Sequence, residues 1–205
     1  MPTLSWVGKN KVVNHHHDVP FRLLDKQYSF TAQDGAPVNS TNNRIIHGDN
    51  LESLKSLLPE FEGKINCIYI DPPYNTLKEG FTYSDALVDK NDTFRHSKWC
   101  SFMSQRLKIA KNLMAKSSAI FISIDDNEVG ALRMLCDEIF GHQNFVANVI
   151  WEKKFSPQND AKWLSDSHDH ILVYAKNKET EHPTNRAETQ SLHCNLCCPR
   201  CMCIE

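Results

Sequence analysis

The sequence has few glycines, and no two of them stand close together. Seven glycines occur in 205 residues, and the nearest pair is Gly130 and Gly141. Closely spaced glycines form the turns by which a backbone approaches a nucleotide-containing cofactor. The spacing therefore excludes a glycine-rich cofactor loop within these residues.

Neither sign of charge dominates, and no long apolar run is present. Lys and Arg total 23, Asp and Glu total 25, and the formal net charge is −2. A dedicated nucleic-acid coat is usually basic, so any contact with nucleic acid must come from local patches. No run approaches the roughly 18 apolar residues of a membrane span, and residues 1–7 do not resemble a secretory signal. We therefore expect a cytoplasmic protein with no membrane partner.

The first 193 residues contain little cysteine. Only Cys67, Cys100 and Cys136 occur there, each in apolar surroundings, and the other five of the eight cysteines fall between Cys194 and Cys203. A disulfide framework would spread its cysteines along the chain. We exclude one, and expect the three isolated cysteines to be small buried hydrophobic residues.

The chain divides into three segments by composition. Residues 1–43 are polar and contain turn-forming residues, so they are predicted to be an arm; we interpret its run His15-His16-His17 as solvated, not as a metal site. Residues 44–178 carry regular apolar patterns and form the predicted domain. Residues 179–205 lose this periodicity and are predicted to be a disordered, cysteine-rich tail.

Strand and helix patterns alternate along 44–178. Short apolar runs predict strands at 44–47, 65–70, 119–124, 145–151 and 170–174. Helical spacing predicts helices over 51–58, from Ser97 to Met114, and over 129–139. Asp49 or Asn50 is a suitable cap for the first helix, and Pro59 and Gly63 are expected to close it. This alternation predicts an open α/β sheet with flanking helices.

The most informative motif is Asp71-Pro72-Pro73-Tyr74, which directly follows the predicted buried strand 65–70. In open α/β sheets, ligands bind at the carboxyl ends of strands. Asp and Pro are also common turn residues, so the four letters alone are equally compatible with an ordinary turn.

The motif suits reaction at an exocyclic base amine. The lone pair of such an amine is delocalised into the ring, and acceptors aimed at its N–H groups favour a pyramidal, nucleophilic nitrogen. The Asp71 carboxylate supplies one acceptor, and the Pro72 carbonyl, held because proline fixes φ, supplies another. Tyr74 can stack on a base turned out of a duplex, a contact worth ~1–3 kcal/mol.

Asp71-Pro72-Pro73-Tyr74 resembles the catalytic motif of amino-methyltransferases. The whole segment 44–178 is similar to the modification subunits of type III restriction systems and related beta-type DNA adenine-N6 methyltransferases. The other matching stretches are 47–51 (HGDNL), 121–128 (FISIDDNE), 136–141 (CDEIFG), 149–151 (VIW) and 169–174 (DHILVY), with 13–16 and 19–20 in the arm.

This resemblance implies a Rossmann-like sheet that uses S-adenosylmethionine to methylate N6 of a flipped adenine in double-stranded DNA, directly and without a metal. It makes Asp71, Pro72, Pro73 and Tyr74 catalytic. It gives Asp49 a role in holding the adenosine part of the donor, beside its reading as a helix cap. A restriction subunit and a homodimer are the partners implied for a complete enzyme.

The family carries a Phe-x-Gly-x-Gly donor loop after a target-recognition region near its C-terminus, and this sequence has neither. We therefore expect an incomplete sheet, ended by a frameshift or premature stop, that binds the donor weakly. The strand 65–70 would lose its neighbour, which predicts poor solubility. A zinc site at Cys194-x-x-Cys197 and Cys198-x-x-Cys201 is the alternative for the tail.

Four other questions remain at this point. The substrate alternatives are cytosine N4, RNA adenine and protein glutamine, and a catalytically inactive fragment is the alternative to an enzyme. Asp125-Asp126 is interpreted as a helix start in preference to a metal site. The loop that contains Lys153, Lys154 and Lys162 is either a DNA phosphate contact or an ordinary exposed loop.

Overall fold

The computed structural model describes residues 3–28, 43–75, 81–83, 86–88, 92–153, 167–179 and 201–204. Its helices are α1 (Lys9–Val12), α2 (His15–Asp18), α3 (Asn50–Phe61), α4 (Arg95–Leu113) and α5 (Val129–Cys136), with a π-helical turn at Asp137–Gly141 and a 3-10 turn at His142–Asn144. Its strands are β1 (Ile65–Ile70), β2 (Phe81–Tyr83), β3 (Ala86–Val88), β4 (Met114–Ile124), β5 (Phe145–Glu152), β6 (His168–Ala175) and β7 (Cys201–Ile204).

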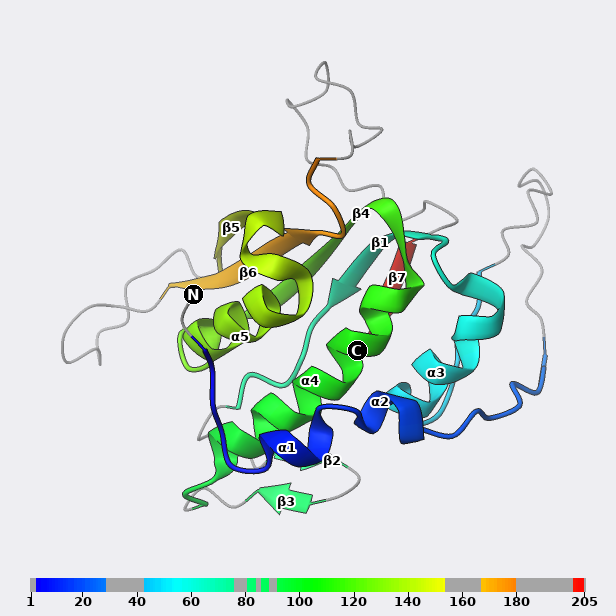
Figure 1. Cartoon of the computed structure of the whole chain (residues 1–205), viewed down its shortest axis with the longest axis horizontal. Helices are drawn as coiled ribbons and strands as arrows, with labels where there is room; N and C mark the ends of the chain where they lie inside the picture. Colours follow the sequence, from blue (N-terminus) through cyan, green and yellow to red (C-terminus); the bar gives the residue numbers. More distant parts are fainter. Residues whose placement is uncertain are drawn as a thin grey trace.

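A five-stranded sheet in the order β5-β6-β4-β1-β7 organises the described residues. β1 runs parallel to β4 and to β7, whereas β6 runs antiparallel to both β4 and β5. β2 and β3 form a separate two-stranded hairpin. The predicted α/β fold with flanking helices is confirmed (Figure 1).

The core lies between the central strands and α4, which crosses the face of β1 and β4 in Figure 1. The sequence explains this packing, because the large apolar residues of α4 recur at helical spacing and those of the strands alternate. Residues with almost no exposure include Trp99, Met103, Leu107 and Leu113 in α4, Ile68 in β1, and Ile120, Ile122 and Ile124 in β4. Since α4 leads directly into β4, its first turn lies at the edge where β1 and β4 end.

The arm is folded where the structure describes it. The Trp6 indole donates to Ser101 Oγ at 2.8 Å, and Lys108 Nζ donates to the Val13 carbonyl at 2.7 Å. The histidine run lies within α2. The first part of the arm is therefore packed along α4.

Two local predictions were wrong. Residues 44–47 form no strand: Ile45 is 93% exposed, and Arg44 pairs with Glu60 of α3 at 2.6 Å. The Pro59 part of the predicted helix end was also wrong, because α3 continues to Phe61, two residues before Gly63. A proline in a last turn removes one backbone hydrogen bond, and the rest of the helix is held by its buried residues Leu54 and Leu57.

The prediction of a wholly disordered tail was wrong for its last described residues. Cys201–Ile204 forms β7, in register with Cys67–Ile70 of β1. The physical reason is the row of backbone N–H and C=O groups on that side of β1, which a strand can pair. On the side of β1 away from β4, the neighbouring strand is therefore β7. His193, Cys194, Cys197 and Cys198 of the zinc alternative lie outside the described residues.

Candidate functional site

The Asp71–Tyr74 motif emerges from the carboxyl end of β1, as predicted. Asp71 and Pro73 are exposed, Pro72 is buried and Tyr74 is half-buried against the core. A carboxylate and an aromatic ring thus stand together at the strand edge where α/β folds bind ligands.

The first turns of α4 contact the Asp71–Tyr74 motif. The buried Trp99 indole donates to the Pro73 carbonyl at 2.7 Å. This contact fixes the backbone between Pro72 and Tyr74. Trp99 was predicted only as part of an apolar stripe, since one sequence does not show which polar atom an indole reaches.

A buried carboxylate holds the residue after the motif. Asn75 has φ 56°, in the left-handed region, and its amide Nδ2 donates to Glu128 Oε1. His96 Nδ1 lies 2.5 Å from the same oxygen. Glu128 is 1% exposed, and its other oxygen, Oε2, has no hydrogen-bond partner among the described residues. Sequence reasoning gave Glu128 no role, although it ends the family-like stretch 121–128 and follows a strand end.

Tyr74 is held as a neutral phenol. Burial raises its pKa well above the ordinary value, and the adjacent Asp71 carboxylate raises it further through its charge and a hydrogen bond. The charge of Asp169 acts in the same direction. The ring is therefore uncharged and partly exposed, as stacking on a base requires.

Asp49 caps α3, as predicted. Its Oδ1 accepts from the backbone N–H of Leu51 at 2.9 Å and of Glu52 at 3.1 Å. Its Oδ2 lies 3.9 Å from Arg106 Nη2, and Arg106 Nε donates to Asn50 Oδ1 at 2.6 Å. The Asp49 side chain is 30% exposed, so part of its carboxylate still faces solvent. Its role toward the donor stays a prediction.

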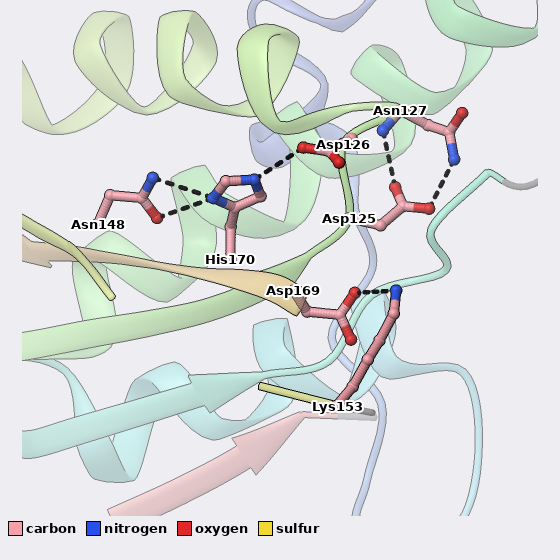
Figure 2. A network of polar contacts seen from close by, with 7 residues as sticks. All are labelled: Asp125, Asp126, Asn127, Asn148, Lys153, Asp169 and His170. Atoms are coloured by element: carbon pink, nitrogen blue, oxygen red, sulfur yellow. Dashed lines mark hydrogen bonds and ion pairs between the residues drawn. The ribbon is translucent and has the colours of Figure 1, made fainter. Parts of the chain in front are cut away.

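Figure 2 shows a polar network near the end of β4 and the start of β6. Asp125 accepts from Asn127 N at 3.0 Å and from Asn127 Nδ2 at 2.6 Å. These bonds close the turn that leads into α5, which fits the interpretation of Asp125-Asp126 as a helix start.

His170 joins two strands to the turn before α5. Its Nε2 lies 2.9 Å from Asp126 Oδ1, and its Nδ1 lies 3.0 Å from Asn148 Nδ2 of β5. Asp126, His168 and His170 bring possible metal-ligand atoms within 4.8 Å of one another. The pairs already formed by His170 account for its position without an ion.

Lys153, a proposed phosphate contact, donates to Asp169 at 2.8 Å (Figure 2). Asp169 and His170 are successive residues of β6, so their side chains lie on opposite faces of the sheet. The rest of the loop, including Lys154 and Lys162, lies outside the described residues. In the described part of the chain, no helix combines the length and apolarity that a bilayer crossing requires.

Comparison with known proteins gives one family match. The family model described as "DNA methylase" (N6_N4_Mtase) matches residues 65–194. That range includes Asp71–Tyr74 and the strands β1, β4, β5 and β6.

Two relatives are Mod subunits of type III restriction-modification enzymes. The EcoP15I subunit of Escherichia coli is 35% identical over 220 residues, 95% of this chain and 34% of the relative. The EcoPI subunit of Escherichia phage P1 is 38% identical over 200 residues, 86% of this chain and 31% of the relative. The chain thus spans about a third of the length of these curated relatives.

A solved structure, the M1.HpyAVI–SAM complex, matches 69% of this chain and 60% of its own. Its sequence is 18% identical and the TM-score is 0.44.

Proposed function

Because the chain belongs to the DNA methylase family, we propose that it carries the catalytic motif of an adenine-N6 methyltransferase of a restriction-modification system. The observation that supports this most is the Asp71–Tyr74 turn at the end of β1, which Trp99 fixes through the Pro73 carbonyl. The proposed substrate is an adenine turned out of double-stranded DNA.

Asp71 and Pro72 orient the amine. The Asp71 carboxylate accepts a hydrogen bond from one N–H, and the Pro72 carbonyl accepts from the other. Both acceptors draw the nitrogen out of conjugation, so its lone pair points away from the base plane. When the nitrogen takes the methyl group, the sulfur that carried it would leave as a neutral thioether, and the nitrogen becomes positively charged. Asp71 and the Pro72 carbonyl stabilise this charge until the nitrogen releases one proton to solvent.

Tyr74 holds the base. Its neutral ring offers a stacking face, and its position between Pro73 and Asn75 is set on both sides by contacts. Pro73 keeps this stretch of backbone stiff because its own φ is fixed. Stacking therefore orients the base plane while Asp71 orients the amine.

S-adenosylmethionine would supply a methyl group carried on a positively charged sulfur. Asp49 is the residue proposed to hold its adenosine part, since the exposed part of the Asp49 carboxylate can accept from a hydroxyl group. α3 and β1 are joined by a short turn, so the start of α3 and the end of β1 lie toward the same edge of the sheet (Figure 1). Asp49 directly precedes α3, and Asp71 directly follows β1. The proposed partners of the complete enzyme are double-stranded DNA, a restriction subunit and a second copy.

The first test is methylation itself. Two preparations are assayed with unmethylated bacterial DNA. One is the chain alone, and the other is the chain co-expressed with the part of the EcoP15I Mod subunit that this chain does not align with. We expect mass spectrometry of the digested DNA to detect N6-methyladenine. The methylation rate of Asp71→Ala should be on the order of 10²-fold lower than that of the wild type. N4-methylcytosine as the sole product, or full turnover with Asp71→Ala, would refute the assignment.

The second candidate function is a catalytically inactive fragment. The wide spacing of the glycines favours it, because it leaves the donor without a close backbone approach. We expect the chain alone to bind S-adenosylmethionine weakly or not at all in isothermal titration. A dissociation constant in the low micromolar range would contradict this expectation.

A further inference from the structure

Glu128 is a carboxylate in an unfavourable place. It is 1% exposed, and burial of a charge is costly unless hydrogen bonds satisfy it. It stands at the N-cap of α5, yet its side chain makes no capping hydrogen bond there. Helix capping therefore does not explain it, and neither does packing, which an apolar residue would serve better.

Only one of its two oxygens is used. Oε1 accepts from both Asn75 and His96, whereas Oε2 has no partner among the described residues. His96 Nε2 accepts from Arg95 Nε at 3.2 Å, which assigns the remaining ring proton to Nδ1 and makes that nitrogen the donor to Glu128. An unsatisfied buried oxygen persists where surrounding contacts over-determine it, and such groups concentrate at functional sites.

Asn75 is the residue that this carboxylate constrains. Among the described residues it alone has a positive φ without being glycine. Asn tolerates the left-handed conformation better than most residues, but the conformation still needs support. Its side chain is 7% exposed and is held by Glu128. The direction in which the chain leaves Tyr74 therefore depends on Glu128.

Two clamps thus flank Tyr74. Trp99 holds Pro73 on one side, and Glu128 holds Asn75 on the other. His96 and Trp99 are three positions apart on α4 and so share a face, which connects both clamps to one helix turn. We infer that Glu128 is a positioning residue: it fixes Asn75, and through it the Tyr74 ring and the Asp71 carboxylate, in the geometry that receives the base. The catalytic consequence rests on the proposed function.

The test compares Glu128→Ala, Glu128→Gln and the control Glu138→Gln, which removes the exposed charge that pairs with Lys9. In the co-expressed enzyme, Glu128→Ala should lower kcat at least tenfold, with KM for DNA within about twofold. Glu128→Gln should restore kcat to within about threefold, because its amide oxygen still accepts from Asn75 and His96. Glu138→Gln should match the wild type. An unchanged kcat in Glu128→Ala, or no restoration in Glu128→Gln, would overturn the inference.

A second pair of variants covers the case in which Glu128→Ala folds poorly. Asn75→Gly keeps the left-handed backbone but cannot reach Glu128. If Glu128 acts through Asn75, the double variant Asn75→Gly with Glu128→Leu, in which an apolar side chain of similar size replaces the carboxylate, loses no more activity than Asn75→Gly alone. Losses that multiply would overturn the inference.

A readout on the chain alone separates this inference from the proposed function. The hydrogen-bonded Trp99 indole N–H reports on the motif by NMR, and its hydrogen exchange should accelerate in Asn75→Gly but not in Glu138→Gln. If the wild type proves inactive, the proposed function fails, while equal exchange rates in all variants would still count against the positioning role.

Discussion

At the residue scale, the phenol groups of Tyr74 and Tyr174 should make Tm depend on pH in the alkaline range. Burial raises the pKa of both phenols above the ordinary value, so the folded state favours their protonated form. That contribution to stability is fully present below about pH 10 and is lost as the pH rises further. We expect Tyr74→Phe to flatten the fall in Tm above pH 10, and Tyr174→Phe to do the same. Identical slopes in wild type and Tyr74→Phe would contradict this.

The residues of the site differ in how far one sequence could predict them. Asp71 to Tyr74 are contiguous and follow an apolar strand, so both their chemistry and their place at the strand end could be read directly. Trp99 and Glu128 reach the motif from 26 and 53 positions away. Their patterns are those of a core stripe and of a helix start, and only the fold shows that they meet Pro73 and Asn75.

At the element scale, α3 combines a structural and a proposed binding role in Asp49, and two substitutions separate them. Asp49→Ala removes the cap and should cost about 0.5–2 kcal/mol of stability. Asp49→Asn keeps an oxygen for the N–H groups of Leu51 and Glu52, so its Tm should stay close to the wild type. A large drop in Tm for Asp49→Asn would show that the charge, not the cap, stabilises α3.

The same variants test the donor role of Asp49 in the co-expressed enzyme. Asp49→Asn should raise KM for S-adenosylmethionine while the protein stays folded, because an amide accepts a hydroxyl proton less strongly than a carboxylate. An unchanged KM would leave Asp49 as a cap only.

Elements were predictable where their signal is local. The leucines between Leu51 and Leu58 predict a helix over 51–58, and α3 spans Asn50–Phe61. The prediction comes close because residues that contact one another in a helix are near in sequence. The segment 44–47 has a strand-like composition but pairs with no strand in the described part of the chain. β7 pairs with β1 across most of the chain, and no local pattern reports such a pairing.

At the scale of the whole molecule, the edge strand β7 tests whether the sheet needs a partner beside β1. Successive N–H groups of a strand point to opposite sides, so only one of Met202 and Cys203 directs its N–H toward β1. Proline is tolerated on the outer side of an edge strand and not on the inner side. We expect the proline substitution at the position whose N–H faces β1, either Met202→Pro or Cys203→Pro, to lower Tm and increase aggregation. The proline substitution at the other position should resemble the control variant Cys203→Ser. Wild-type behaviour in both would show that β7 does not stabilise the sheet.

The docking of α1 along α4 has a consequence for the growing chain. Trp6 and its partner Ser101 are 95 positions apart. At a synthesis rate of about 5–20 residues per second, the N-terminal helices leave the ribosome roughly 5–20 seconds before the surface that receives them. Throughout that interval Val12 and Val19, buried in the finished protein, face solvent. A nascent chain arrested before α4 should therefore be cut by proteases near its N-terminus, and one arrested after β4 should be protected there.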